Sequence, residues 1–368
     1  MNITSLTLHH LRMNLRSPFE TSFGKIQTRD CILIEAESKG LKGFGECVAD
    51  RDPGYSYETS LTAWHILKDF LIPTVLNHEI KSVYNLHNKL NFVRGHQMAK
   101  AGLEMAYWDL IGKYQNKSLK QLIGGMRSKV TVGVSIGIQE NINKLVKLVN
   151  SYVNKGYQRI KIKIKPTRDI EETRSVRKAF PTLQLQVDAN SAYTLKTASS
   201  LFPLDNLNLL LIEQPLADDD LWDHSKLQKQ IKTPLCLDES ILSVRHAKQA
   251  IEMNACKIIN IKAGRVGGIL EAIAIHDLCM NKNVPVWCGG MLETGVGRAA
   301  NLALASLPGF TLPGDISATD RYYDEDITQE QFILNPDSTI DVPDKPGLGI
   351  TINSSVLEKF TVTSEIFS

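Results

Sequence analysis

Five ionisable residues recur along the chain at an almost constant interval, and each ends a short apolar run. They are Lys163, Asp188, Glu213, Asp238 and Lys262, and the steps between them are 25, 25, 25 and 24 residues. A step of that length is one strand plus one helix, so the five side chains are expected at the same end of consecutive parallel strands. Together they could form a metal site of three carboxylates with a basic lysine on either side.

The three carboxylates indicate a hard divalent cation. Buried like charges destabilise a fold unless something neutralises them. Ligation by oxygen alone favours Mg²⁺, with Mn²⁺ as the second choice. The nine histidines form no HxH or HxxxH pair, which disfavours a zinc or non-haem iron site. Any one acidic residue after a strand could instead cap the next helix, but three in register are poorly explained as caps.

The two lysines suit acid–base chemistry. Lys163 and Lys262 belong to strands on either side of the acidic strands, so we expect them to face each other across a planar intermediate. Lys161 projects in the same direction as Lys163, because residues two apart in a strand share a face. A second ammonium group that close lowers the pKa of a neighbouring lysine and makes it a better base. These groups fit removal of a proton α to a carboxylate, with the metal stabilising the enolate.

The elements that must position these residues begin at about residue 125, where short apolar strands alternate with amphipathic helices. The strand candidates are VTVGVSIG, RIKIKI, LQLQVDA, LLLIEQP, TPLCLDE, KIINIKA, PVWCGG and FTLPGD. Segments such as DIEETRSVRKAF and GGILEAIAIHDLCM read as crossover helices. Eight such units predict a (β/α)8-type barrel, whose active site lies at the carboxyl ends of its strands. A doubly wound nucleotide-binding sheet is disfavoured because no GxGxxG follows an early strand.

The segment before the barrel predicts a smaller α+β capping domain. Residues 2–15, 30–38 and 42–48 read as strands, with a turn at Lys39-Gly40, and the polar segment SPFETSFGKIQTRD reads as a long functional loop. YETSLTAWHILKDFLIP and MAKAGLEMAYWDLIGKYQN have helical periodicity, and we expect these helices to stop at Pro73 and Asn116. The predicted division is a capping domain at 1–120, a barrel at 121–320, and a segment at 321–368 that returns to the capping domain.

Composition excludes several classes of function. The chain has 368 residues and a formal net charge of +2, with no surplus of basic residues for nucleic acid or a membrane surface. No stretch reaches 18 apolar residues, and the N-terminus does not resemble a signal peptide. The six cysteines form no CxxC pair and lie mostly in apolar runs, so we expect reduced, buried thiols and a cytoplasmic protein.

These motifs resemble the muconate-lactonising subgroup of the enolase superfamily. The matching runs are KIK at 161–163, DAN at 188–190, EQP at 213–215, DES at 238–240 and KAGRVGG at 262–268. The run WCGGMLETGVGRAAN at 287–301, followed by LPGD at 312–315, is similar to the o-succinylbenzoate synthase and N-succinylamino acid racemase family. The resemblance covers essentially the whole chain.

The resemblance implies roles for named residues. Asp188, Glu213 and Asp238 would bind Mg²⁺, Lys163 and Lys262 would be the acid–base pair assisted by Lys161, and Glu239 would support the metal ligands. Residues that would contact a small carboxylate substrate are Phe19, Ser22, Phe23, Tyr55, Ser135, Asn190, Arg265, Gly290 and Met291. We also expect identical chains to associate into a homo-oligomer.

Two activities of the family remain open. One is dehydration of a cyclohexadiene carboxylate to o-succinylbenzoate in menaquinone biosynthesis, and the other is racemisation of N-succinylamino acids. A dipeptide epimerase or muconate cycloisomerase is more remote, because Arg265 and GGMLETG fit the first family. A non-catalytic barrel is disfavoured because all five periodic residues are present. The loop ADRDPGYSYET departs from the family, with Asp50, Arg51 and Asp52 at positions that are often more apolar, and this puts the substrate's identity in question.

Overall fold

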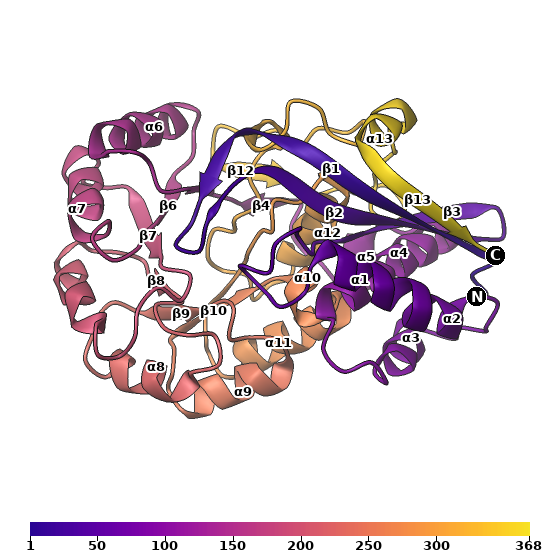
Figure 1. The fold of residues 1–368 in the computed structure, drawn as a ribbon, viewed down its shortest axis with the longest axis horizontal. Coiled ribbons are helices and arrows are strands. Elements are labelled where there is room, and N and C mark those ends of the chain that lie inside the picture. Colours follow the sequence, from indigo (N-terminus) through magenta and orange to yellow (C-terminus); the bar gives the residue numbers. More distant parts are fainter.

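The first and last strands of the chain lie side by side in one antiparallel sheet. In the computed structural model, which describes residues 1–368, the sheet has the order β13-β1-β2-β3. Its strands are β1 Ser5–Glu20, β2 Lys25–Ser38, β3 Leu41–Cys47 and β13 Thr361–Phe367. Leu6 pairs with Phe367, so the C-terminal segment completes the sheet and both termini lie at one end of the molecule (Figure 1).

The hairpin of β1 and β2 is longer than the sequence indicated. The predicted loop over Ser17–Asp30 is wrong, because the two strands continue through it and leave only residues 21–24 as a turn. Their register shifts between Asn14 and Phe19, and Pro18 lies in this irregular stretch, where the ladder requires no N–H from it. The turn therefore stands at the end of a long, well-supported ribbon.

Helices pack against this sheet and form the rest of the capping part. They are α1 Ser60–Ile66, the π-helical segment η1 Leu67–Leu71, α2 Ile72–Val75, α3 Val83–Leu90, α4 Gln97–Gln115 and α5 Leu119–Ile123. The expected stop at Pro73 is wrong, because proline is accepted in the first turn of α2. Asn116 caps α4 in the left-handed conformation, as expected. A Cβ on Gly45 of β3 or Gly102 of α4 would collide with backbone atoms, so glycine permits their close approach.

Parallel strands form the second part, a curled sheet in the order β11-β10-β9-β8-β7-β6-β5. The strands are β5 Val134–Ile136, β6 Arg159–Lys163, β7 Gln184–Asp188, β8 Ile212–Glu213, β9 Leu235–Leu237, β10 Ile258–Ile261 and β11 Val286–Cys288. The larger helices that follow individual strands are α6 Ile142–Asn154, α7 Ile170–Ala179, α8 Leu221–Gln228, α9 Val244–Glu252, α11 Ile269–Asn281 and α12 Gly295–Ala305. Figure 1 shows α6 to α9 on the outside of the strands. The (β/α)8-type architecture is thus confirmed.

One strand of that prediction is wrong. FTLPGD forms no regular strand but two isolated parallel bridges, Phe310 to Val286 of β11 and Gly314 to Val132. Pro313 has no N–H to donate to a ladder, which limits regular pairing here. Because the bridges reach toward both edges of the curled sheet, the segment still closes the ring without being a full strand.

Shorter elements complete the chain. They are β4 Lys129–Thr131, η2 Ala198–Asn206, α10 Ala263–Val266, η3 Thr319–Arg321, β12 Thr339–Asp341 and α13 Ser354–Phe360. β4 pairs antiparallel with β12, so the predicted strand VTVGVSIG is divided between two sheets.

The two parts have different cores that share the capping sheet. Leu6 and Leu8 of β1 belong to a cluster with the capping helices, whereas Leu11 and Met13 belong to the barrel's cluster. The same strand therefore fixes the capping part against the barrel. The domain boundaries near residues 120 and 320 stay a prediction. No helix combines the length and the apolar character that crossing a lipid bilayer requires.

Candidate active site

Three carboxylates meet at the carboxyl ends of neighbouring strands. Asp188 ends β7, Glu213 ends β8, and Asp238 directly follows β9. Parallel pairing sets Asp188 beside Glu213, and an oxygen from each of the three lies within 4.8 Å of the others. All three side chains are fully buried. The regular interval in the sequence therefore brings three oxygen donors together, while their role as metal ligands stays a prediction.

Lys163 and Lys262 flank this cluster from opposite ends. Lys163, the last residue of β6, donates through Nζ to Asp188 Oδ2 at 2.7 Å and to Asn190 Oδ1 at 2.6 Å. Lys262, directly after β10, donates to Asp238 Oδ2 at 2.7 Å. Because β7, β8 and β9 lie between β6 and β10, the two ammonium groups approach the carboxylates from two sides.

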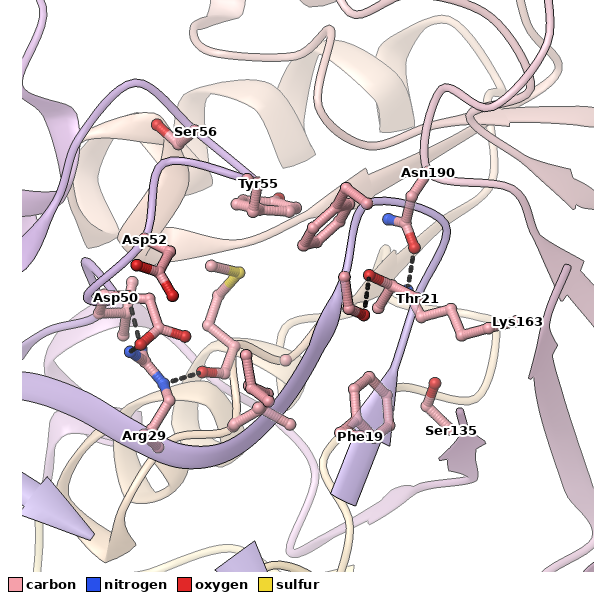
Figure 2. Close-up of a pocket in the computed structure, with 18 of the residues that line it drawn as sticks. Phe19, Thr21, Arg29, Asp50, Asp52, Tyr55, Ser56, Ser135, Lys163 and Asn190 are labelled. Atoms are coloured by element: carbon pink, nitrogen blue, oxygen red, sulfur yellow. Dashed lines mark hydrogen bonds and ion pairs between the residues drawn. The ribbon is translucent and has the colours of Figure 1, made fainter. Parts of the chain in front are cut away.

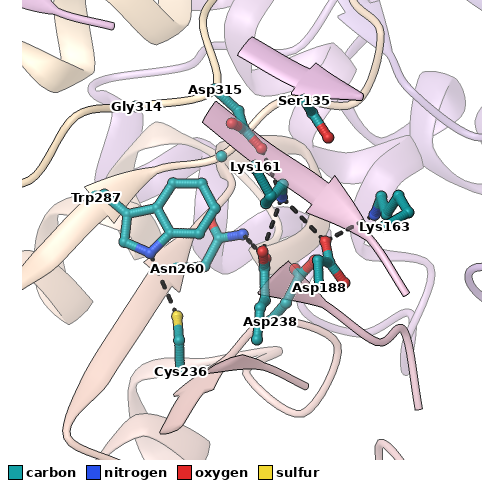
Figure 3. Close-up of polar contacts among 12 residues, drawn as sticks. Ser135, Lys161, Lys163, Asp188, Cys236, Asp238, Asn260, Trp287, Gly314 and Asp315 are labelled. Atoms are coloured by element: carbon teal, nitrogen blue, oxygen red, sulfur yellow. Dashed lines mark hydrogen bonds and ion pairs between the residues drawn. The ribbon is translucent and has the colours of Figure 1, made fainter. Parts of the chain in front are cut away.

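A third ammonium group lies deeper, among three carboxylates. Lys161 Nζ is 3.0 Å from Asp188 Oδ2, 2.8 Å from Glu213 Oε2 and 2.6 Å from Asp315 Oδ2. Figure 3 shows this side chain between Asp188 on one side and Asp315 on the other. The alternation expected along β6 is therefore observed, since Lys161 and Lys163 both point into the barrel.

Burial and neighbouring charges shift the pKa values in opposite directions. Burial raises the pKa of Glu213, and the charge of Asp188 adds to the rise. Burial also acts on Asp188, but the ammonium groups of Lys163 and Lys161 outweigh it and hold its pKa well below the usual range. For Lys262, burial opposes the charged form, yet Asp238 raises its pKa above the ordinary value. Burial therefore dominates at Glu213, whereas neighbouring opposite charges dominate at Asp188 and Lys262.

The residues fit a hard divalent cation. The donor set contains only carboxylate oxygens, with no imidazole or thiolate among them. Glu239, next to Asp238, has one oxygen bonded to Asn190 Nδ2 at 2.7 Å, but its Oε2 is buried without a partner. Burial and the charge of Asp238 raise the pKa of Glu239 to about 8. An unpartnered buried carboxylate oxygen beside three converging carboxylates fits a site that takes a cation.

A cavity of about 1100 Å³, its open mouth included, lies between the capping loops and the barrel. Its walls contain the three lysines and most of the predicted substrate contacts. These contacts are Phe19, Phe23, Tyr55, Ser135, Asn190, Gly290 and Met291. Figure 2 shows Lys163 and Asn190 at one end of the cavity and Arg29 and Asp50 at the other.

Two predicted contacts lie elsewhere. Ser22 is not part of the cavity wall, and its hydroxyl donates to the Asn190 carbonyl at 2.9 Å, which ties the turn to the barrel. Arg265 is also absent from the wall; it lies behind Asp238, pairs with that carboxylate, and donates from Nε to the Ile241 carbonyl at 2.8 Å. From this position the Arg265 guanidinium can offset the negative charge of Asp238 and fix the orientation of its carboxylate.

Tyr55 joins the capping loop to the carboxylate cluster. Its hydroxyl donates to Asp238 Oδ1 at 2.9 Å and accepts from Lys262 Nζ at 3.1 Å. Sequence reasoning placed this residue at the substrate but not on Asp238. The loop that covers the cavity therefore also helps to fix Lys262.

Sequence reasoning missed several charged residues of the cavity wall, among them Arg29 and Asp315. The buried guanidinium of Arg29 lies 3.3 Å from Asp50 Oδ1 and donates to the carbonyls of Val48 and Met291, so it connects two loops over the site. Asp315 is the last residue of the last predicted strand, FTLPGD. The strand-end argument, extended by two more strands, would have found Asp315, whereas nothing in the sequence around Arg29 distinguishes it.

Comparison with known families matches both parts of the chain. Residues 3–124 match the model of the mandelate racemase / muconate lactonizing enzyme N-terminal domain, and residues 144–356 match the enolase C-terminal domain-like model.

Individual proteins of known name match over nearly the full length. An o-succinylbenzoate synthase of Geobacillus stearothermophilus is 48% identical, with 100% of this chain and 98% of the relative covered. An N-succinylamino acid racemase of Amycolatopsis sp is 47% identical, with 98% of each chain covered. The crystal structure of an enolase superfamily member from Listeria innocua is 42% identical, with a TM-score of 0.95 and coverage of 100% and 99%.

Proposed function

Since the chain belongs to the enolase superfamily, in its mandelate racemase / muconate lactonizing enzyme branch, we propose that it is an o-succinylbenzoate synthase. The reaction is loss of water from a cyclohexadiene carboxylate, started by removal of the proton α to the carboxylate. The placement of Lys163 and Lys262 at opposite ends of three converging carboxylates in one cavity supports removal of that proton, the step that both activities of the family share. The observation that favours the synthase is the similarity to several relatives named o-succinylbenzoate synthase.

In this proposal Asp188, Glu213 and Asp238 hold Mg²⁺, with Mn²⁺ as an alternative. A bound divalent cation supplies Lewis-acid stabilisation of the negative charge that develops on the substrate carboxylate. Lys163 takes the α-proton, and the same proton then leaves with the departing hydroxyl as water. Lys262, which donates to Asp238 Oδ2 at 2.7 Å, stabilises that charge from the other side as an ammonium ion.

The cavity wall suits a substrate with a polar group beyond its reacting end. Ser135 Oγ is buried, lines the cavity and has no partner in the protein. Its hydroxyl is therefore free to donate to a carbonyl or carboxylate oxygen of the substrate's succinyl part. Phe19 and Met291 offer apolar surface in the same cavity wall.

Racemisation of N-succinylamino acids is the second candidate. It is favoured by the two-sided arrangement of the lysines, because dehydration requires one base whereas racemisation requires a base on one face and an acid on the other. In this reaction Lys163 and Lys262 would exchange roles for the two enantiomers. The Amycolatopsis relative, an N-succinylamino acid racemase, also supports it.

A direct comparison of kcat/KM on the two substrate classes tests the assignment. We expect turnover of the cyclohexadiene carboxylate to exceed racemisation of every N-succinylamino acid in a panel of apolar and charged side chains. A higher kcat/KM for racemisation would reverse the order of the two candidates. Lack of turnover of both would refute the proposed chemistry. We further propose a cytoplasmic location and association of identical chains.

A further inference from the structure

We propose that Asp315 is a positioning residue, the counter-ion that holds Lys161 in place when a divalent cation occupies the neighbouring carboxylates. Sequence reasoning gave this residue no role. The inference rests on the metal site of the proposed function, but not on which of the two reactions the protein catalyses.

Asp315 has one oxygen for each of two buried cations. Its Oδ2 is 2.6 Å from Lys161 Nζ, and its Oδ1 is 2.6 Å from Arg159 Nη1. Lys161 and Arg159 are both on β6, two residues apart, so their side chains share the inward face. Asp315 is therefore bound to β6 by a pair of charge-assisted contacts. Figure 3 shows Asp315 next to Lys161.

The backbone around Asp315 leaves its carboxylate little freedom. Arg159 Nη2 donates to the Pro313 carbonyl at 3.1 Å and also to the Gly314 carbonyl. The Asp315 N–H donates to the Cys288 carbonyl at 2.8 Å. A Cβ on Gly290 would lie 2.8 Å from the Asp315 carbonyl oxygen, so the neighbouring loop packs directly on it. Such a fixed carboxylate can hold an ammonium group at one point.

Lys161 and a divalent cation would compete for the same carboxylates. Two of its three partners, Asp188 and Glu213, are members of the proposed metal site. When a cation shares the charge of these two residues, Asp315 is the carboxylate partner that remains for Lys161 alone. A buried ammonium group without a partner is strongly disfavoured, so loss of Asp315 would return Lys161 to the metal-site carboxylates and weaken cation binding.

A merely structural Asp315 predicts something different. If the residue only closes the ring by pairing with Arg159, or only adds negative charge near the site, its effect on cation affinity does not depend on Lys161. A double-mutant cycle separates these cases, because it measures how much one side chain's effect depends on the other.

The experiment is Mg²⁺ titration by calorimetry, without substrate, of the parent protein, Asp315→Asn, Lys161→Met and the double variant. We expect Asp315→Asn to weaken Mg²⁺ binding at least about tenfold when Lys161 is present, and by less than about twofold in the Lys161→Met protein. Asp326→Asn is the matched control: this buried carboxylate accepts from the Gly295 N–H at 2.8 Å, away from Lys161. It is expected to leave Mg²⁺ affinity unchanged.

Equal weakening in both backgrounds, or no weakening in a folded Asp315→Asn, would overturn the proposal. Circular dichroism and melting curves establish folding of each variant. If Asp315→Asn does not fold, Asp315→Glu replaces it in the cycle, because it retains a charge for Arg159 while displacing the carboxylate from Lys161. The same dependence on Lys161, with a smaller factor, is then expected. A parent protein that binds no Mg²⁺ refutes the metal site itself, and failure of the synthase assignment alone leaves this test intact.

Discussion

Each of the two lysines beside the carboxylate cluster donates hydrogen bonds to two neighbouring residues. Lys262 is held by Asp238 and Tyr55, and Lys163 by Asp188 and Asn190. Each of these two lysines is thus anchored to a different carboxylate of the proposed metal site. A change at one carboxylate therefore alters both cation binding and the position of one lysine.

Removing one carboxylate should abolish function. In Asp238→Ala, Mg²⁺ affinity and turnover are both expected to fall by at least about a hundredfold, because one ligand is lost and Lys262 loses its partner. Asp344→Ala, at an exposed carboxylate bonded to Lys120, is the control and should bind Mg²⁺ normally. Calorimetry and assays with and without a chelator measure the effect. Appreciable turnover after chelation would remove the metal from the proposed reaction.

How far the sequence could predict the site depends on the kind of contact. The convergence of Asp188, Glu213 and Asp238 could be predicted, because strand ends of parallel units meet at one edge and the interval is regular. The contact of Tyr55 with Asp238 could not, since it joins a capping loop to a strand 183 residues away and depends on how the two parts dock. Arg29 shows the same limit, because its partners come from separate loops.

The elements over the cavity differ in how firmly they are held. The turn after β1 is held by β1 and β2, which pair as far as Glu20 and Lys25. The sequence did not predict this long hairpin in full, because pairing continues through a polar segment that contains a proline. In the second loop, Asp50 Oδ1 accepts from the backbone N–H of Arg51 at 2.7 Å and pairs with Arg29, so Asp50 is part of the scaffold. Asp52 is exposed and lines the cavity.

Because Asp50 is bonded within the protein and Asp52 is not, we expect Asp52 to be the acidic residue that contacts the side chain of the substrate. Asp52→Leu is expected to shift the kcat/KM ranking of N-succinylamino acids toward apolar side chains by roughly tenfold, because an unpaired carboxylate favours polar or cationic groups. Mg²⁺ affinity should stay the same. Arg51→Leu is the control, because Arg51 is exposed and is not part of the cavity wall. An unchanged ranking in Asp52→Leu would show that this loop does not select the side chain.

At the scale of the whole molecule, the capping sheet and the barrel are joined by a buried carboxylate. Glu46 of β3 accepts from the Thr294 hydroxyl at 2.6 Å and from the Gly297 N–H at 3.0 Å, at the N-terminus of α12. Burial raises the pKa of Glu46 to about 7, and the charge of Glu293 adds to the rise, while Thr294 and Arg29 oppose it. The junction is therefore less stable when Glu46 is ionised.

The raised pKa of Glu46 determines whether the free energy of unfolding rises or falls with pH. The pKa of Glu46 is about 7 in the folded protein and 4.5 when the side chain is free of the fold, as in the unfolded chain. The folded state therefore binds the proton more tightly, and the free energy of unfolding falls as pH rises between these two values. Relative to Glu46→Gln, the parent should gain about 2 kcal/mol in its free energy of unfolding when pH is lowered from about 7.5 to 5.5. Denaturant unfolding at both pH values measures it. Glu252→Gln, at an exposed position of α9, is the control and should show the same change in free energy of unfolding with pH as the parent. The prediction is contradicted if this change is the same in Glu46→Gln as in the parent.

The central claim is that Lys163 and Lys262 act from opposite faces of one substrate, and hydrogen exchange in deuterated water tests it most directly. The samples are Lys163→Ala and Lys262→Ala, each given the separate enantiomers of an N-succinylamino acid, with exchange of the α-proton followed by NMR. We predict that each variant loses exchange for one enantiomer only, that the two variants lose opposite enantiomers, and that the loss is at least about a hundredfold. Exchange of both enantiomers at the parent rate in either variant, or loss of the same enantiomer in both, would contradict the two-sided site.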